Sequence, residues 1–264
     1  MNPPEPTLKL YTFITSPNGR KVEAMLSHLM RILPMIAFGV AAVEPICVQA
    51  ATYPPVQAYM IPKDEEVALA RTAAPANISG SATIKVLGLS GYKVEVSGTN
   101  GFVCSVMRGF TAPTYTPKDF RDLVYDPSVR APICFNPLAA EVVMPYYELR
   151  TELGMKGQSP DEIMSGVQAA YATGKLPKRD AVSFGYMWSA EQNLGPGISH
   201  WHPHMMVFAP YQNNAMLGNN QFGLPVPFVS DDADTPFSVV LIPVDDRLAI
   251  GRHTQSAAAH SHTP

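Results

Sequence analysis

Residues 83–108 read TIKVLGLSGYKVEVSGTNGFVCSVMR. Three segments of this stretch, Thr83–Leu87, Tyr92–Ser97 and Phe102–Arg108, are rich in β-branched, aromatic and other apolar residues, a composition typical of strands. Two four-residue turns that begin and end with Gly separate the segments, and the second contains Asn-Gly, a strong hairpin signal. We therefore expect a three-strand antiparallel meander here.

Helices and more strands are expected after the meander. Ser159-Pro160-Asp161-Glu162 has Ser at the N-cap, Pro at the first helical position and Glu at the third, which predicts a helix to about Ala172. A second helix is expected over about 138–153, with a kink at Pro145. This order of elements predicts an α+β fold, with an antiparallel sheet of about six strands and helices packed on one face. The other expected strands are Val182–Trp188, Met205–Ala209 and Phe237–Val244, and the expected irregular segments are 110–137 and 210–236.

The composition fits one sizeable domain and excludes some partners. The chain has 264 residues, of which 46% are hydrophobic and 16% charged, with 26 prolines and a net charge of −3. Such a chain can bury a large core and has many proline-marked turns. The slightly acidic balance argues against nucleic-acid binding, and no run of Lys and Arg could bind an anionic membrane surface.

Residues 30–50 have the parts of a secretory signal peptide. Met30-Arg31 gives a short positive start, residues 32–43 are an apolar run, and Val48-Gln49-Ala50 has small residues where a signal peptidase cleaves. The run is shorter than the roughly 20 residues that cross a bilayer, so we expect no stable transmembrane span. A buried core helix is the alternative, although Pro34 disfavours a regular helix.

A signal peptide implies a secreted or periplasmic mature chain in three parts. Residues 51–63 are a Pro-rich arm, and residues 64–251 are expected to form the single α+β domain. Residues 252–264 are mostly Ala, Ser, His and Thr, a composition that predicts a disordered tail.

Residues 1–29 precede the expected signal and have a different character. Leu8–Phe13 is a strand pattern, and Ser16-Pro17-Asn18-Gly19 indicates a turn that opens a helix. Residues 8–28 resemble the first strand, active-site turn and helix start of glutathione transferases, which implies that Ser16 and Asn18 would approach a glutathione sulfur. The resemblance stops there, so these residues are either a transferase-like fragment or the product of a mis-assigned start.

A second resemblance covers residues 64–250. The fragments Gly101-Phe-Val-Cys104, Pro132-Ile-Cys-Phe-Asn-Pro137 and Trp201-His-Pro-His204 are similar to segments of exported bacterial proteins of unassigned function. This resemblance implies a secreted domain and no particular activity.

The cysteines predict one disulfide. Cys47 falls within the expected signal peptide, which leaves Cys104 and Cys134 as a pair in an oxidising compartment. Cys104 lies in an expected strand and Cys134 in an expected irregular segment, so the bond would join a strand to a covering loop. Two buried free thiols are the alternative.

The histidines suggest a metal site. His200, His202 and His204 alternate, and in an extended chain alternate residues point to the same side. Three imidazoles can bind zinc and leave an open position for a water nucleophile. Packing of histidines in a loop is the alternative, and the sequence identifies no fourth ligand.

Three functions follow from these patterns. The first is a non-catalytic exported domain that binds a small ligand or an envelope component. In that case the aromatic and Met-rich strands at Phe184–Trp188 and Met205–Phe208 would line an apolar pocket, unless they simply form core. The second is a metal-dependent hydrolase that uses the three histidines with zinc. The third is a glutathione-transferase-like protein.

Overall fold

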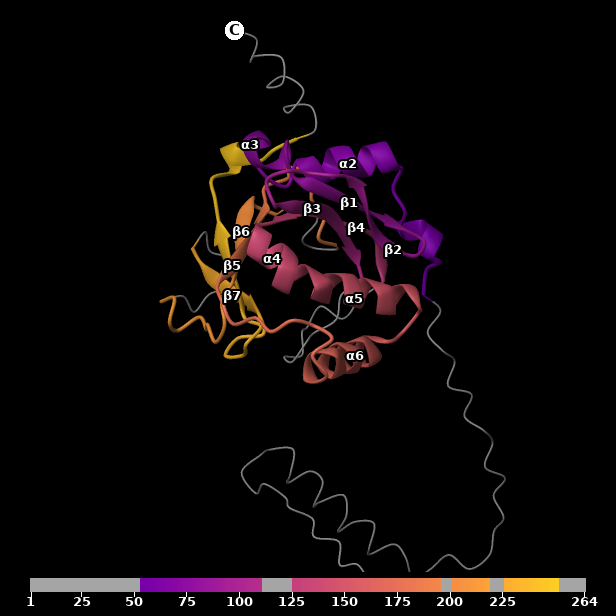
Figure 1. Cartoon of the computed structure of the whole chain (residues 1–264). Coiled ribbons are helices and arrows are strands. Elements are labelled where there is room, and N and C mark those ends of the chain that lie inside the picture. Colours follow the sequence, from indigo (N-terminus) through magenta and orange to yellow (C-terminus); the bar gives the residue numbers. More distant parts are fainter. Residues whose placement is uncertain (1–52, 111–124, 196–200, 219–225, 252–264) are drawn as a thin grey trace, which may run out of the picture. The chain divides into compact units, whose positions relative to one another are not determined.

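A computed structural model describes residues 53–110, 125–195, 201–218 and 226–251 (Figure 1). These residues all belong to the second of two compact units, Thr52–Pro264. The expected transferase-like fragment, signal peptide and tail lie outside the described residues. Within the described part, no helix combines the length and the apolar character that a bilayer crossing requires.

The described strands form one mixed sheet of eight strands, in the order β2-β1-β3-β4-β5-β6-β8-β7. β1 and β3 pair in parallel, and the other neighbours pair antiparallel. The α+β class is therefore confirmed, while the sheet is larger than the six strands expected. The strands are β1 (Thr83–Gly88), β2 (Gly91–Val96), β3 (Val103–Gly109), β4 (Asp126–Phe135), β5 (Ser183–Met187), β6 (His204–Phe208), β7 (Phe228–Asp231) and β8 (Val239–Pro243).

Helices cover both faces of the sheet, so the expectation of helices on one face is wrong (Figure 1). Leu69 of α2 packs with Val106 and Cys134 on one face, whereas Val143 packs with Phe135 on the other. β3 and β4 are buried along both sides, so their inner parts lack the alternation of a half-exposed strand. The helices are η1 (Val56–Tyr59), α2 (Lys63–Arg71), α3 (Ala76–Ser79), α4 (Pro137–Val142), α5 (Met144–Met155), α6 (Pro160–Ala172) and η3 (Asp246–Leu248).

The expected meander is wrong in its last connection. β1 and β2 form the expected hairpin, but β3 pairs with β1 instead of β2. The Asn-Gly turn crosses the start of β1, where the N–H of Thr99 donates to the carbonyl of Ser81. A Cβ at Gly98 would lie 2.2 Å from backbone atoms of Ala82 and Thr83. The glycine therefore permits a close crossing of two chain segments rather than a hairpin.

The expected helices and all six expected strands are present, with changes in detail. α6 begins with the expected capping box, in which Ser159 and Glu162 bond reciprocally. The expected kink at Pro145 is a full break at Val143, with Pro145 in the first turn of α5. β4 lies in a segment expected to be irregular because of its prolines. Pro132 pairs with Val106 of β3 but lies outside the short ladder between β4 and β5, so its missing N–H is tolerated there.

The disulfide between Cys104 and Cys134 is confirmed. The two residues lie directly opposite in the β3–β4 ladder, with their Cα atoms 3.9 Å apart. Both are fully buried on the face that α2 covers. The bond joins two neighbouring strands, and not a strand to a covering loop, because the segment with Cys134 is itself a strand.

Candidate binding site

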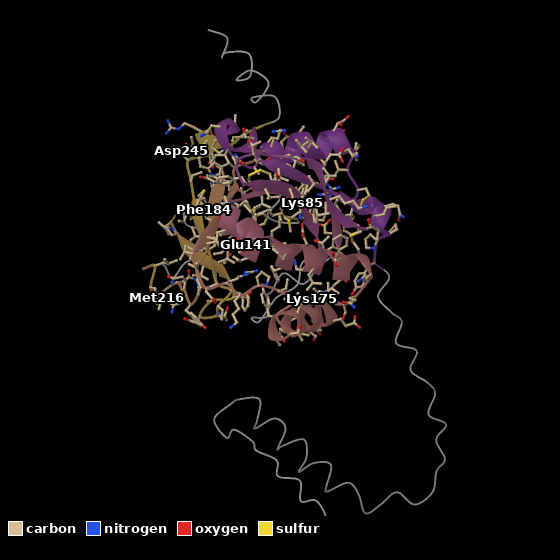
Figure 2. The ribbon with its side chains drawn as sticks, viewed as in Figure 1. Lys85, Glu141, Lys175, Phe184, Met216 and Asp245 are labelled. Carbon is tan, nitrogen blue, oxygen red and sulfur yellow. A yellow bond between two sulfur atoms is a disulfide. The ribbon has the colours of Figure 1, made fainter. Side chains whose placement is uncertain are left out.

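A pocket of about 570 Å³ lies where the C-terminal end of α6 meets three loops. This volume is in the range of small-molecule sites. Figure 2 labels Lys175, which lies between the end of α6 and the loop that contributes three of the lining residues. The lining residues are Gln168, Tyr171, Ala172, Lys178, Arg179, Asp180, Pro210, Tyr211, Pro236 and Phe237.

Local backbone bonds fix both sides of the pocket. On one side, Gly174 follows the end of α6 with φ +73°, and the N–H of Leu176 donates to the carbonyl of Ala170. On the other side, the N–H of Tyr211 donates to the carbonyl of Thr235 at 2.8 Å, which ties the two loops to each other. The walls are therefore held by hydrogen bonds.

Tyr211 stands out at the rim of the pocket. Its side chain is 59% exposed, and its backbone has φ +59°, a conformation that costs energy for residues other than Gly. Because most of this residue is exposed, burial of its ring does not offset the cost of the backbone conformation. Strained backbone of this kind clusters at functional sites, and Tyr211 also lines the pocket, which makes it a candidate contact for a ligand.

Arg179 is the central residue of the site. It is only 7% exposed, and its guanidinium carbon lies 4.8 Å from the ring centre of Tyr146, 5.0 Å from Phe237 and 5.9 Å from Tyr171. Within the described part of the chain, its Nε and Nη2 are buried and have no hydrogen-bond partner. Arginine stays charged in proteins, so two buried donors of a cation are left unsatisfied.

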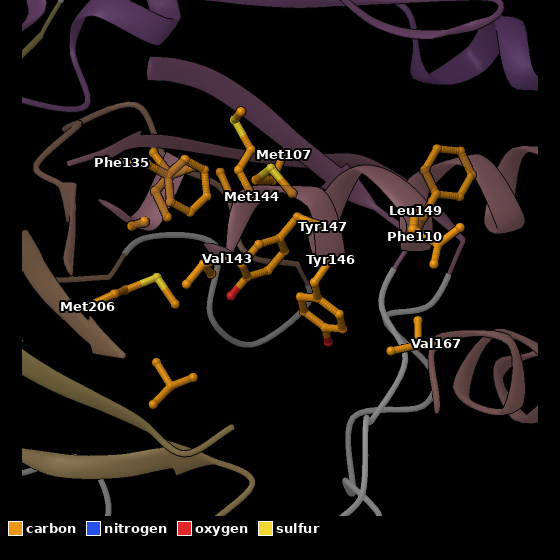
Figure 3. Close-up of a cluster of buried hydrophobic side chains, with 14 of the residues drawn as sticks. Met107, Phe110, Phe135, Val143, Met144, Tyr146, Tyr147, Leu149, Val167 and Met206 are labelled. Carbon is orange, nitrogen blue, oxygen red and sulfur yellow. The ribbon is translucent and has the colours of Figure 1, made fainter. Parts of the chain in front are cut away.

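A second arginine adds positive charge on the α5 side of this cluster. The guanidinium carbon of Arg150 lies 5.2 Å from the ring centre of Tyr146 and 4.8 Å from that of Tyr147. Figure 3 shows both tyrosine rings extending away from α5. The guanidinium groups of Arg150 and Arg179 therefore both lie near the single ring of Tyr146.

The remaining charges of the pocket balance one another. Lys178 and Asp180 both line it and have opposite signs, so Arg179 gives the lining its net charge. Three rings and two prolines supply flat apolar surface beside that charge. This combination suits a small molecule with one charged group and an apolar body.

Two of the three histidines expected to bind metal, His202 and His204, do not line this pocket. His200 lies outside the described residues. His202 is half exposed, and its Nδ1 lies 2.6 Å from a carboxylate oxygen of Asp246. His204 is buried, its Nδ1 lies 2.8 Å from the carbonyl oxygen of His202, and burial lowers its pKa to about 4. Among the described residues no group of three His, Cys, Asp or Glu could hold a metal ion. The three-His zinc site stays a prediction.

The sequence did not point to this pocket. The strands expected to line an apolar pocket contribute Met187, Met206 and Phe208 to the main hydrophobic core. Arg179 follows a helix stop in a short charged segment, which resembles an ordinary exposed loop in sequence. Its burial depends on rings from α5, α6 and residue 237, and no local pattern encodes that convergence.

The chain was compared with protein-family models, with curated proteins and with solved structures, and none of them matches it.

Proposed function

We propose that this domain works outside the cytoplasm as a non-catalytic binding protein for a small organic anion, held in the pocket beside Arg179. The observation that supports this most directly is the buried guanidinium at the pocket wall, two of whose nitrogens have no hydrogen-bond partner among the described residues. Each unsatisfied buried donor costs about 1–3 kcal/mol, more when it is charged. An anion that bonded to both donors would recover that free energy on binding.

The rings around Arg179 support the same proposal. Stacking on aromatic faces holds the guanidinium in place before any ligand arrives, at a gain of about 0.5–2 kcal/mol per contact. A cation already fixed in position loses little conformational entropy on binding, and such preorganisation favours affinity.

Export is supported by the signal pattern at residues 30–50 and by the disulfide between Cys104 and Cys134. Disulfides of this kind persist in oxidising compartments. We expect the exported form to begin near Ala51. N-terminal sequencing checks this, and an exported chain that still begins at Met1 would contradict it.

Thermal unfolding in the presence of anions tests the binding function. The panel contains carboxylates, phosphate monoesters and sulfonates, each with a neutral analogue, at constant ionic strength. At 100 times its Kd, a ligand of the folded state raises the free energy of unfolding by about 2.7 kcal/mol. We expect at least one anion to stabilise the wild type and to lose that effect in Arg179→Met.

Lys175→Met is the matched control, because Lys175 is an exposed cation of the same loop region that does not line the pocket. It should respond to the anions as the wild type does. Equal responses of the wild type and Arg179→Met to every anion would contradict the proposal.

A further inference from the structure

We infer that the ligand is a monocarboxylic acid with a flat apolar body, bound side-on by Nε and Nη2 of Arg179; this inference rests on the proposed anion-binding function. The two unsatisfied nitrogens form one edge of the planar guanidinium. Their N–H groups point in parallel, and this spacing matches the two oxygens of one carboxylate. The third nitrogen, Nη1, is not required.

The helix at the pocket favours a singly charged anion over a phosphate. α6 contributes its C-terminal end, with Gln168, Tyr171 and Ala172 lining the pocket. The C-terminal end of a helix has a partial negative charge, whereas phosphate sites use the positive N-terminal end. A phosphate dianion would also face the carboxylate of Asp180, and Lys178 alone can offset that carboxylate. One negative charge fits this balance better than two.

The rest of the lining defines the body of the ligand. Tyr171, Tyr211 and Phe237 present rings, and Pro210 and Pro236 present flat apolar surfaces. Rings prefer offset or edge contacts with other flat groups. A carboxylate joined to an aromatic or similarly flat group can therefore bond to Arg179 and stack on these residues in one pose.

Two of the rings that contact Arg179 also line the pocket. Tyr171 and Phe237 both lie over Arg179 and both line the pocket, with their ring centres 4.4 Å apart. Nε and Nη2 are buried in this structure, so a carboxylate reaches them only when a side chain of the pocket lining moves. Binding of the acid should therefore change the environment of these two rings.

Three matched probes test the ligand class: 2-naphthoate, 2-naphthyl phosphate and 2-naphthamide. Calorimetric titration of the full-length protein gives their dissociation constants. We expect 2-naphthoate to bind at least tenfold more tightly than either of the others. Arg179→Lys keeps the charge but lacks the parallel donors, and should bind 2-naphthoate at least tenfold more weakly. Lys175→Met, which removes an exposed cation outside the pocket lining, should change this affinity less than threefold.

The outcomes separate this inference from the function on which it rests. Tighter binding of 2-naphthyl phosphate that depends on Arg179 would overturn the carboxylate inference and keep the anion site. Equal binding by the wild type and Arg179→Lys would overturn the side-on geometry. Failure of 2-naphthoate to bind would overturn the inference, and the proposed function itself would fail only if no anion of the wider panel depended on Arg179.

Discussion

Arg108 and Arg179 are both buried and both charged, but their surroundings differ. Nε of Arg108 donates to the carbonyl of Tyr59 at 2.7 Å, Nη1 donates to the carbonyl of Val106, and Nη2 lies 2.7 Å from a carboxylate oxygen of Glu66. The guanidinium of Arg179 instead contacts the faces of aromatic rings, and its Nε and Nη2 have no hydrogen-bond partner among the described residues. The fold thus satisfies one buried arginine internally, and the other, at a pocket wall, can be satisfied by a ligand.

His204 is a third buried basic residue, and it is accommodated in a different way. Burial lowers its pKa to about 4, so the ring is neutral at pH 7, and its Nδ1 keeps a hydrogen bond to the carbonyl of His202. An arginine cannot lose its proton in this way. Of these three buried basic residues, only Arg179 is neither fully paired nor neutral, which is why we assign it to binding rather than to folding.

Arg108→Met should produce the largest loss of stability. It leaves Glu66 buried without its counter-ion, and removal of one partner of a buried pair costs about 3–5 kcal/mol. Urea unfolding at pH 7 measures this loss. Glu66→Leu combined with Arg108→Met removes both charges and should recover most of the lost stability.

The pH dependence of Arg108→Met checks the cause of its loss. Burial already raises the pKa of Glu66, and Arg108 opposes that rise. Without Arg108 the pKa rises further, so the carboxyl group is neutral in the folded variant at low pH. A carboxyl group whose folded pKa is raised contributes stability below its unfolded pKa. That contribution is lost as the pH rises through the folded pKa. The deficit should therefore be smaller at pH 4.5 than at pH 7, and a deficit independent of pH would exclude an unpaired carboxylate as its cause.

His204 should make the fold sensitive to acid. Its folded pKa lies below its unfolded value of 6.5, so the unfolded state binds the proton first and stability falls as pH falls from 6.5 to about 4. The full effect is about 3 kcal/mol. His204→Asn can keep the bond to the His202 carbonyl without titrating. The wild type should lose more stability than this variant over that interval, and parallel losses would show that His204 does not remain neutral.

Arg179→Met should have the smallest effect on stability. The loss of stacking on the rings costs about 0.5–2 kcal/mol, and the removal of two unsatisfied charged donors offsets much of that cost. We expect a net change within about 1 kcal/mol at pH 7 by urea unfolding. A loss as large as that of Arg108→Met would mean that Arg179 has a structural partner, and the contrast between the two arginines would disappear.

Sequence patterns predicted the features of this fold that depend on few residues better than those that depend on many. The capping box at Ser159 and the pairing of Cys104 with Cys134 depend on few residues, and both are confirmed. The turn at 98–101 was misinterpreted as a hairpin because Gly98, which a close crossing over β1 requires, also fits a tight turn. β4 was missed because its Pro132 is tolerated only where the ladder to the next strand is short.

The candidate site was beyond sequence reasoning for a related physical reason. Whether Arg179 is buried depends on Tyr146, Tyr171 and Phe237, which lie up to 91 positions apart in the sequence. The expected zinc site rested on a local alternation, and the half-exposed His202 and the buried His204 have different surroundings. Periodicity shows which residues can share a face. It does not show which polar groups on that face have hydrogen-bond partners.

A crystal structure of the protein grown with 2-naphthoate tests the central claim most directly, because it shows what bonds to the guanidinium of Arg179. We predict that the two carboxylate oxygens lie about 2.7–2.9 Å from Nε and Nη2, with the naphthyl group against Tyr211 or Phe237. An Asp, Glu or carbonyl oxygen of the chain itself bonded to both nitrogens, with no ligand in the pocket, would contradict the claim.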